Sequence, residues 1–149
     1  MSTVKLSDEE NYAILAEQFG EGISSLGATD QRRVVKRLYT VLDSSNPQYY
    51  IYETVEGCDE LQVIREGDSL RIYCRLVMGI PQNNKHYNVL FAFYVDTHDY
   101  ESKTLSHLDE AAEQWLEEIT EFSAVTDVDA YLQTHDAKTP EFFADRLDR

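Results

Sequence analysis

Apolar and polar residues alternate through the middle of the chain, as in strands that bury one face. Residues 86–95 and residues 61–65 carry this pattern, and residues 70–78 place on one face Leu70, Ile72, Cys74, Leu76 and Met78. Within 86–95 the apolar face is expected to hold Tyr87, Val89, Phe91, Phe93 and Val95. Polar residues at 66–69 and 81–85 suit turns. The pattern predicts three antiparallel strands, and residues 49–56, rich in aromatic and β-branched types, predict one more extended segment.

Helical spacing flanks this meander on both sides. A capping box at residues 7–10 and apolar residues at 12, 15, 16 and 19 predict a first helix, which the glycines from Gly20 onward end. A second helix is expected from Thr29 or Asp30 to about Leu42, because Pro47 follows. Helices are also expected over 106–122, after Asp127 and after Pro140. The chain therefore predicts a single α+β domain over residues 1–149, with an N-terminal helical hairpin, an antiparallel sheet of three to four strands and C-terminal helices.

Charge is distributed unevenly along the 149 residues, whose formal net charge is −15. Residues 31–90 carry eight basic and seven acidic residues, whereas residues 91–149 carry four basic and fifteen acidic residues. An acidic surface of this kind is typical of proteins from a salty, halophilic cytoplasm, where salt screens the repulsion. Alternatively, an acidic ligand would meet the nearly neutral middle and be repelled by the ends.

Targeting and metal signals are scarce. No apolar run approaches the roughly 18 residues of a transmembrane helix, and the first residues lack the basic and apolar regions of a secretory signal. Cys58 and Cys74 have neither a CxxC spacing nor nearby histidines, so we expect reduced thiols and no metal site. These features predict a cytoplasmic protein with no membrane contact.

The central segments resemble those of a known family. DELQVIREGDSLRIYCRLV, followed by VLFAFYVDTHDYESK and LDEAAEQW, is similar to the paired strands, apolar strand, polar loop and alanine-containing helix of the RelE/ParE superfamily, particularly its HigB-like and RelE-like branches. These are toxins of type II toxin–antitoxin systems. The resemblance covers residues 30–120 as a RelE-like core and leaves residues 121–149 as an acidic helical C-terminal extension.

The resemblance implies a metal-independent endoribonuclease without cofactors. In such enzymes the ribose 2′-hydroxyl attacks the adjacent phosphate, which requires cations and an acid/base pair. The implied catalytic residues are Arg71, His98 and Tyr100. The implied phosphate-binding residues are Arg75, Arg65, Arg33 and Arg37. The implied partners are mRNA, commonly on the ribosome, and a cognate antitoxin.

Two features depart from the family pattern and keep an alternative open. Asp96 and Thr97 stand where HigB-like members often show a lysine pair, and a chain of this acidity is poorly suited to a polyanion. Arg71 and Arg75 can instead pair with Glu60, Glu66 or helix carboxylates. The alternative is a non-catalytic RelE-fold interaction or regulatory module whose acidic helices bind a basic protein or mimic nucleic acid.

Overall fold

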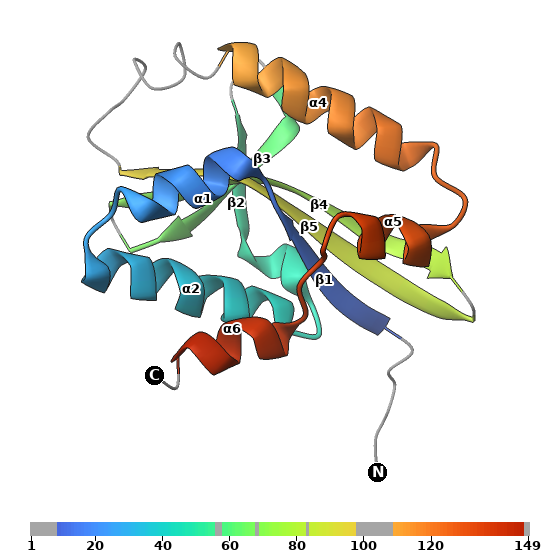
Figure 1. Ribbon diagram of the computed structural model, residues 1–149, viewed down its shortest axis with the longest axis horizontal. Helices are drawn as coiled ribbons and strands as arrows, with labels where there is room; N and C mark the ends of the chain where they lie inside the picture. Colours follow the sequence, from blue (N-terminus) through green and yellow to red (C-terminus); the bar gives the residue numbers. More distant parts are fainter. Residues whose placement is uncertain (1–8, 56–57, 68, 83, 98–108, 148–149) are drawn as a thin grey trace.

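Helices cover both faces of one mixed β-sheet in the computed structural model, which describes residues 9–55, 58–67, 69–82, 84–97 and 109–147. The sheet has five strands in the order β1-β5-β4-β3-β2. Figure 1 shows α1, α2 and α6 on one side of it and α4 and α5 on the other. The α+β class is confirmed, with one strand more than the three or four expected.

The meander forms the body of the sheet. Its strands are β2 (Ile51–Val55), β3 (Cys58–Glu66), β4 (Leu70–Gln82) and β5 (Lys85–Thr97), each antiparallel to the next. The short 3₁₀ helix η2 (Pro47–Tyr50) leads into β2. These strands and turns lie close to where the alternation predicted them.

The first helix was predicted in the wrong place. Residues Glu9–Leu15 form strand β1, which pairs in parallel with β5, and helix α1 spans Glu17–Ser24. Ala13 is buried on one face of the sheet and Ile14 on the other, so β1 has consecutive apolar residues. Such a run also satisfies the spacing of a helix with one apolar face. Gly22 lies inside α1, where a Cβ would come within 2.9 Å of the Val95 carbonyl oxygen.

A bulge also changes the expected faces of β5. Tyr73 pairs with Tyr94 and Cys74 with Ala92, so Phe93 is an extra residue in its strand. Phe93 and Tyr94 therefore pack on the same side as α4, and Val95 packs with α1 and α2. The alternation predicted for 86–95 is correct as far as Phe93 and wrong for Val95.

The remaining helices follow their predicted ranges. Helix α2 spans Ala28–Leu42, and its buried residues are Val34, Leu38, Val41 and Leu42. The C-terminal helices are α4 (Asp109–Ser123), α5 (Val128–Thr134) and α6 (Pro140–Leu147). The Asp127 side chain caps α5 by accepting from the Ala130 N–H at 3.0 Å. Within the described ranges, no helix is long and apolar enough to cross a membrane.

The C-terminal region bridges one outer edge of the sheet at a single residue pair. Residue Lys138, in the connection between α5 and α6, forms an isolated antiparallel bridge with Ala13 of β1. The Ala13 N–H donates to the Lys138 carbonyl at 2.8 Å, and the Lys138 N–H donates back at 2.7 Å. The first strand is therefore held between β5 and a segment more than a hundred residues later in the chain.

Candidate functional site

The five arginines predicted to bind or process RNA are divided between the two faces of the sheet. Arg33 and Arg37 project from α2 on the face covered by helices α1, α2 and α6. The other three arginines lie on the strands: Arg65 on β3, and Arg71 and Arg75 on β4. Their neighbours in the strand are buried against α1, α2 and α6, so the arginine side chains point to the opposite face of the sheet. One RNA phosphate backbone therefore does not meet all five on a single surface.

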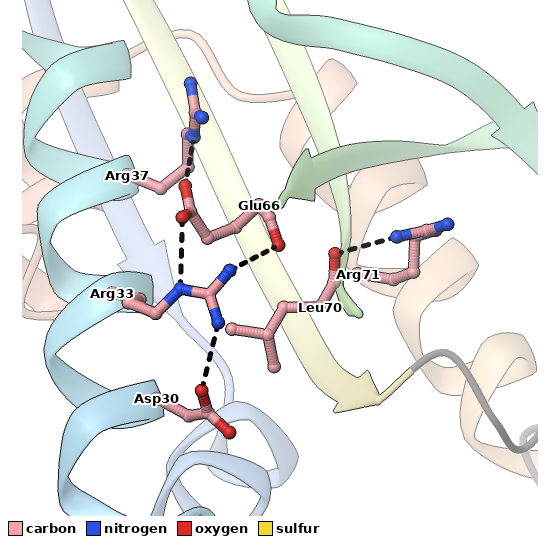
Figure 2. Close-up of polar contacts among 6 residues, drawn as sticks. All are labelled: Asp30, Arg33, Arg37, Glu66, Leu70 and Arg71. Atoms are coloured by element: carbon pink, nitrogen blue, oxygen red, sulfur yellow. Dashed lines mark hydrogen bonds and ion pairs between the residues drawn. The ribbon is translucent and has the colours of Figure 1, made fainter. Parts of the chain in front are cut away.

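Arg33 and Arg37 both bind Glu66, at the end of β3. The Arg37 Nε donates to one carboxylate oxygen at 2.8 Å, and the Arg33 Nε lies 3.4 Å from the other. Arg33 also forms an ion pair with Asp30 at 3.2 Å. Figure 2 shows the two guanidinium groups reaching from α2 onto Glu66, and Arg71 pointing away beyond Leu70. We call Asp30, Arg33, Arg37 and Glu66 the Glu66 clamp, because it fastens α2 to the β3–β4 turn.

The clamp also requires a glycine in that turn. Gly67 has a φ of +64°, and a Cβ there would come within 2.1 Å of Arg33 Nη2. A side chain would therefore be strained by the backbone conformation and would displace the guanidinium. The turn and the arginine positions depend on each other.

On the opposite face, two arginines stand side by side in a row across three strands. Arg71 of β4 is directly opposite Arg65 of β3 on one side and Asp96 of β5 on the other. We call these three residues the arginine row. Like charges directly opposite one another are unfavourable unless an anion lies near. Arg71 itself is only 9% exposed, and its Nη1 donates to the Leu70 carbonyl at 3.1 Å.

Arg75 lies two residues farther along β4 and is held weakly by Glu60. The Arg75 Nη2 is 3.8 Å from the Glu60 carboxylate, and its Nη1 is 3.5 Å from the Glu60 carbonyl. The Arg75 Nε is buried, and the described residues offer it no hydrogen-bond partner. This pairing agrees with the ion-pair interpretation of Arg75 and leaves part of its hydrogen-bonding capacity unused.

The other two predicted catalytic residues, His98 and Tyr100, lie outside the described residues. The preceding residue, Thr97, ends β5. Of the described residues, no group of three histidine, cysteine, aspartate or glutamate side chains is arranged to hold a metal ion. Cys74 is a buried free thiol, and burial raises its pKa.

The outer face of α4 carries an open acidic groove. It has a volume of about 460 Å³ and is lined by Glu113, Leu116, Glu117, Thr120 and Glu121. The three glutamates are exposed and follow one another at intervals of four residues, so they form one stripe along the helix. No described cation forms an ion pair with any of them. Leu116 gives the groove a partly apolar floor.

A polar network that no sequence pattern predicts lies at the beginning of β5. The Tyr87 hydroxyl donates to Asp129 of α5 at 2.7 Å, and Lys85 donates to Glu10 of β1 at 2.6 Å. Tyr12 donates to the same Glu10 carboxylate and packs edge-to-face on Tyr87, with ring centroids 5.2 Å apart. These groups meet only because β1 is a strand beside β5. No spacing within a predicted helix at 7–19 brings them together.

Hydrogen bonds and burial shift the pKa values of Glu10, Tyr12 and Tyr87 in this network. Donation to Asp129, with burial, raises the pKa of Tyr87 to about 12. The hydrogen bond from Lys85 lowers the pKa of Glu10, and burial together with Glu10 raises that of Tyr12. Hydrogen bonds from neutral tyrosines to carboxylates are the chemistry of a structural contact between β1, β5 and α5.

No family model matches the chain, and neither the curated proteins nor the solved structures contain a match to it.

Proposed function

We propose that this protein is a non-catalytic, RelE-like interaction module whose acidic groove binds a basic, amphipathic segment of a partner protein. A cognate antitoxin with such a segment is the partner that the family resemblance favours. The observation that carries the proposal is the glutamate stripe of α4, which has no described counter-charge and borders Leu116. An unpaired stripe of one sign beside an apolar position suits a helix with lysines and leucines on one face.

The cations support this choice over catalysis. A ribonuclease must hold several free cations around one phosphate. Here the Glu66 clamp occupies Arg33 and Arg37, Arg75 faces Glu60, and Arg71 is nearly buried. A protein with a net charge of −15 also gains little from the phosphate neutralisation on which RNA affinity depends.

A defined peptide tests the groove. We expect a labelled helical peptide with three lysines spaced four residues apart, beside a row of leucines, to bind in fluorescence anisotropy titrations. The triple variant E113K/E117K/E121K should weaken binding at least about a hundredfold, because three charge pairs become repulsive. Leu116→Ala should weaken it several-fold with little change in salt dependence, because that variant removes apolar contact only.

The matched control is E21K/D43K/D145K, which makes the same change in net charge at exposed positions in α1, at the C-cap of α2 and in α6. It should bind the peptide almost as the wild type does. Equal loss in both triple variants would mean that the peptide senses only net charge, and the groove would then have no specific role.

RNA cleavage is a second candidate, and the arginine row favours it. Arg65 and Arg71 face the side of the sheet opposite α2, and Asp96 lies two residues before His98, in the segment to which the resemblance assigns the acid/base residues. If this function holds, expression should arrest growth, and purified protein should cut mRNA in the presence of EDTA. Arg71→Ala should abolish both effects and Arg71→Lys should retain part of them.

Since Arg71 is buried, Arg65→Ala serves as a second variant, and circular dichroism reports whether each remains folded. Harmless expression together with intact mRNA at low and high salt would exclude the ribonuclease.

A further inference from the structure

The two outer edges of the sheet differ in whether another backbone segment pairs with them. The β1 edge is occupied by the bridge to Lys138. The β2 edge faces no other strand among the described segments, since β3 is its one partner in the sheet. An open edge presents unpaired backbone N–H and C=O groups, and proteins normally cover or blunt such edges. The open edge of β2 is therefore a place where another extended chain can pair.

The most exposed aromatic side chains of the described chain lie at this same edge. Tyr49, in η2, is 78% exposed, and Tyr52, in β2, is 56% exposed. Tyr49 packs edge-to-face on Tyr50, with ring centroids 5.2 Å apart. Large exposed aromatics are enriched where proteins bind other proteins, because they bury much apolar area with few rotatable bonds. The open backbone and the exposed rings are independent observations that coincide.

One cation at this edge has no described carboxylate partner. The Arg65 guanidinium carbon lies 4.4 Å from the centroid of the Tyr52 ring. It forms no ion pair within the described residues, although Arg33, Arg37 and Arg75 each do. Its cross-strand neighbour is another cation, Arg71. An acidic side chain placed over Tyr52 would compensate the charge of Arg65.

A second copy of this chain is a poorer occupant. Antiparallel pairing of two β2 strands centred on Glu53 places two exposed glutamates directly opposite one another. Like charges in that position destabilise a strand pair. The charges at this edge instead favour a strand that brings an acidic residue to Arg65 and a neutral residue to Glu53.

We propose that the β2 edge binds an extended peptide segment of a partner protein by strand addition, with an acidic residue of that segment on Arg65 and apolar residues on Tyr52. This surface lies on β2 and η2 rather than α4, so it is independent of the acidic groove. Backbone pairing supplies the affinity, and Arg65 selects the charge.

Three synthetic peptides test the inference by anisotropy and by amide chemical shifts. The first is a ten-residue strand of alternating valine and threonine with a glutamate at each end. The second has lysine in place of glutamate, and the third repeats the first with alternate backbone nitrogens methylated. We expect the first to bind and to shift the amides of Ile51–Val55. The second and third should each bind at least about tenfold more weakly.

Protein variants complete the test. Arg65→Glu should weaken the glutamate peptide at least about tenfold and strengthen the lysine peptide, and Tyr52→Thr should weaken both while keeping a strand-forming residue. The groove variant E113K/E117K/E121K should bind the glutamate peptide no more weakly than wild type. Failure of strand addition at β2 can therefore be distinguished from failure of peptide binding at the acidic groove.

Four results would overturn the proposal. Two concern the peptides: the glutamate peptide does not bind at millimolar concentration, or the methylated peptide binds equally well. The others are a dimer, detected by sedimentation, that protects the β2 amides, and an oligouridylate that binds through Tyr52 and Arg65 in preference to the peptide.

Discussion

Glu66 joins α2 to the sheet through a single side chain, because its one carboxylate binds two arginines. Its side chain is 19% exposed, against 56% for Glu60, which faces Arg75 at 3.8 Å. Glu66→Gln should therefore lower the free energy of unfolding by about 1–2 kcal/mol, since two guanidinium groups lose their counter-charge. Glu60→Gln should change it by less than about 0.5 kcal/mol. Urea unfolding of the two variants measures the difference, and equal effects would show that the clamp is no stronger than a surface pair.

Ionisation of Tyr87 makes the free energy of unfolding depend on pH in the alkaline range. Its pKa of about 12 in the folded protein lies above the ordinary value of 10. The unfolded chain therefore loses its proton first, and the stabilisation from Tyr87, complete below pH 10, disappears as the pH rises toward 12. Tyr87→Phe should remove this part of the pH dependence and cost about 1 kcal/mol at neutral pH, because the bond to Asp129 is lost. Tyr52→Phe, at an exposed ring, is the control, and an unchanged profile in Tyr87→Phe would contradict the assignment. Unfolding curves between pH 8 and 12 measure it.

Alanine substitutions at two glycines of α1 are expected to change the stability of the protein in opposite directions. A Cβ at Gly22 would lie 2.9 Å from the Val95 carbonyl oxygen, whereas one at Gly20 meets nothing within 4 Å. Gly22→Ala should push α1 away from β5 and destabilise by about 1–3 kcal/mol. Gly20→Ala should stabilise by about 0.5–1 kcal/mol, because alanine favours the helix. Thermal unfolding of both variants is the measurement, and two shifts of the same sign would contradict the close contact.

The elements also show what the sequence could predict. The meander, α2 and the C-terminal helices followed from alternation, caps and turn residues, which are local signals. Strand β1 could not be predicted in this way, because the apolar residues of Tyr12–Leu15 fit both a helix with one apolar face and a strand buried on two faces. Only the parallel pairing with β5, a contact between residues about 77 apart, decides between them. The bulge at Phe93 likewise depends on the register with β4, which no residue of β5 specifies alone.

The candidate site was predictable only in part. The alternation predicted Arg71 and Arg75 on the face of β4 opposite Leu70, and the structure has them there, but their carboxylate partners follow from tertiary packing. The Glu66 clamp joins α2 to the end of β3 across 29 residues of chain. The acidic groove was expected as an acidic helix face, and the partly apolar floor at Leu116 was not anticipated.

The net charge of −15 should make the melting temperature of the protein depend on salt concentration. Mutual repulsion favours the expanded chain, and salt screens it over roughly 10 Å at 0.1 M. We therefore expect the melting temperature to rise as sodium chloride is increased. The rise should be smaller in E113K/E117K/E121K, which carries six fewer units of negative charge. A melting temperature that falls with salt would mean that ion pairs, rather than repulsion, dominate the electrostatics.

The bridge between Ala13 and Lys138 has a consequence for biosynthesis. Strand β1 is synthesised before every other described element, yet its neighbours in the finished sheet are β5, about 77 residues later, and Lys138. The apolar residues of β1 therefore lack a strand partner until β5 has been synthesised, and the bridge from Ala13 forms only after Lys138 has followed. Folds whose contacts join distant parts of the chain form slowly and are vulnerable to aggregation meanwhile. Strand β1 is thus unprotected while the helices and strands between it and β5 are made, and its bridge at Ala13 waits for the connection between α5 and α6.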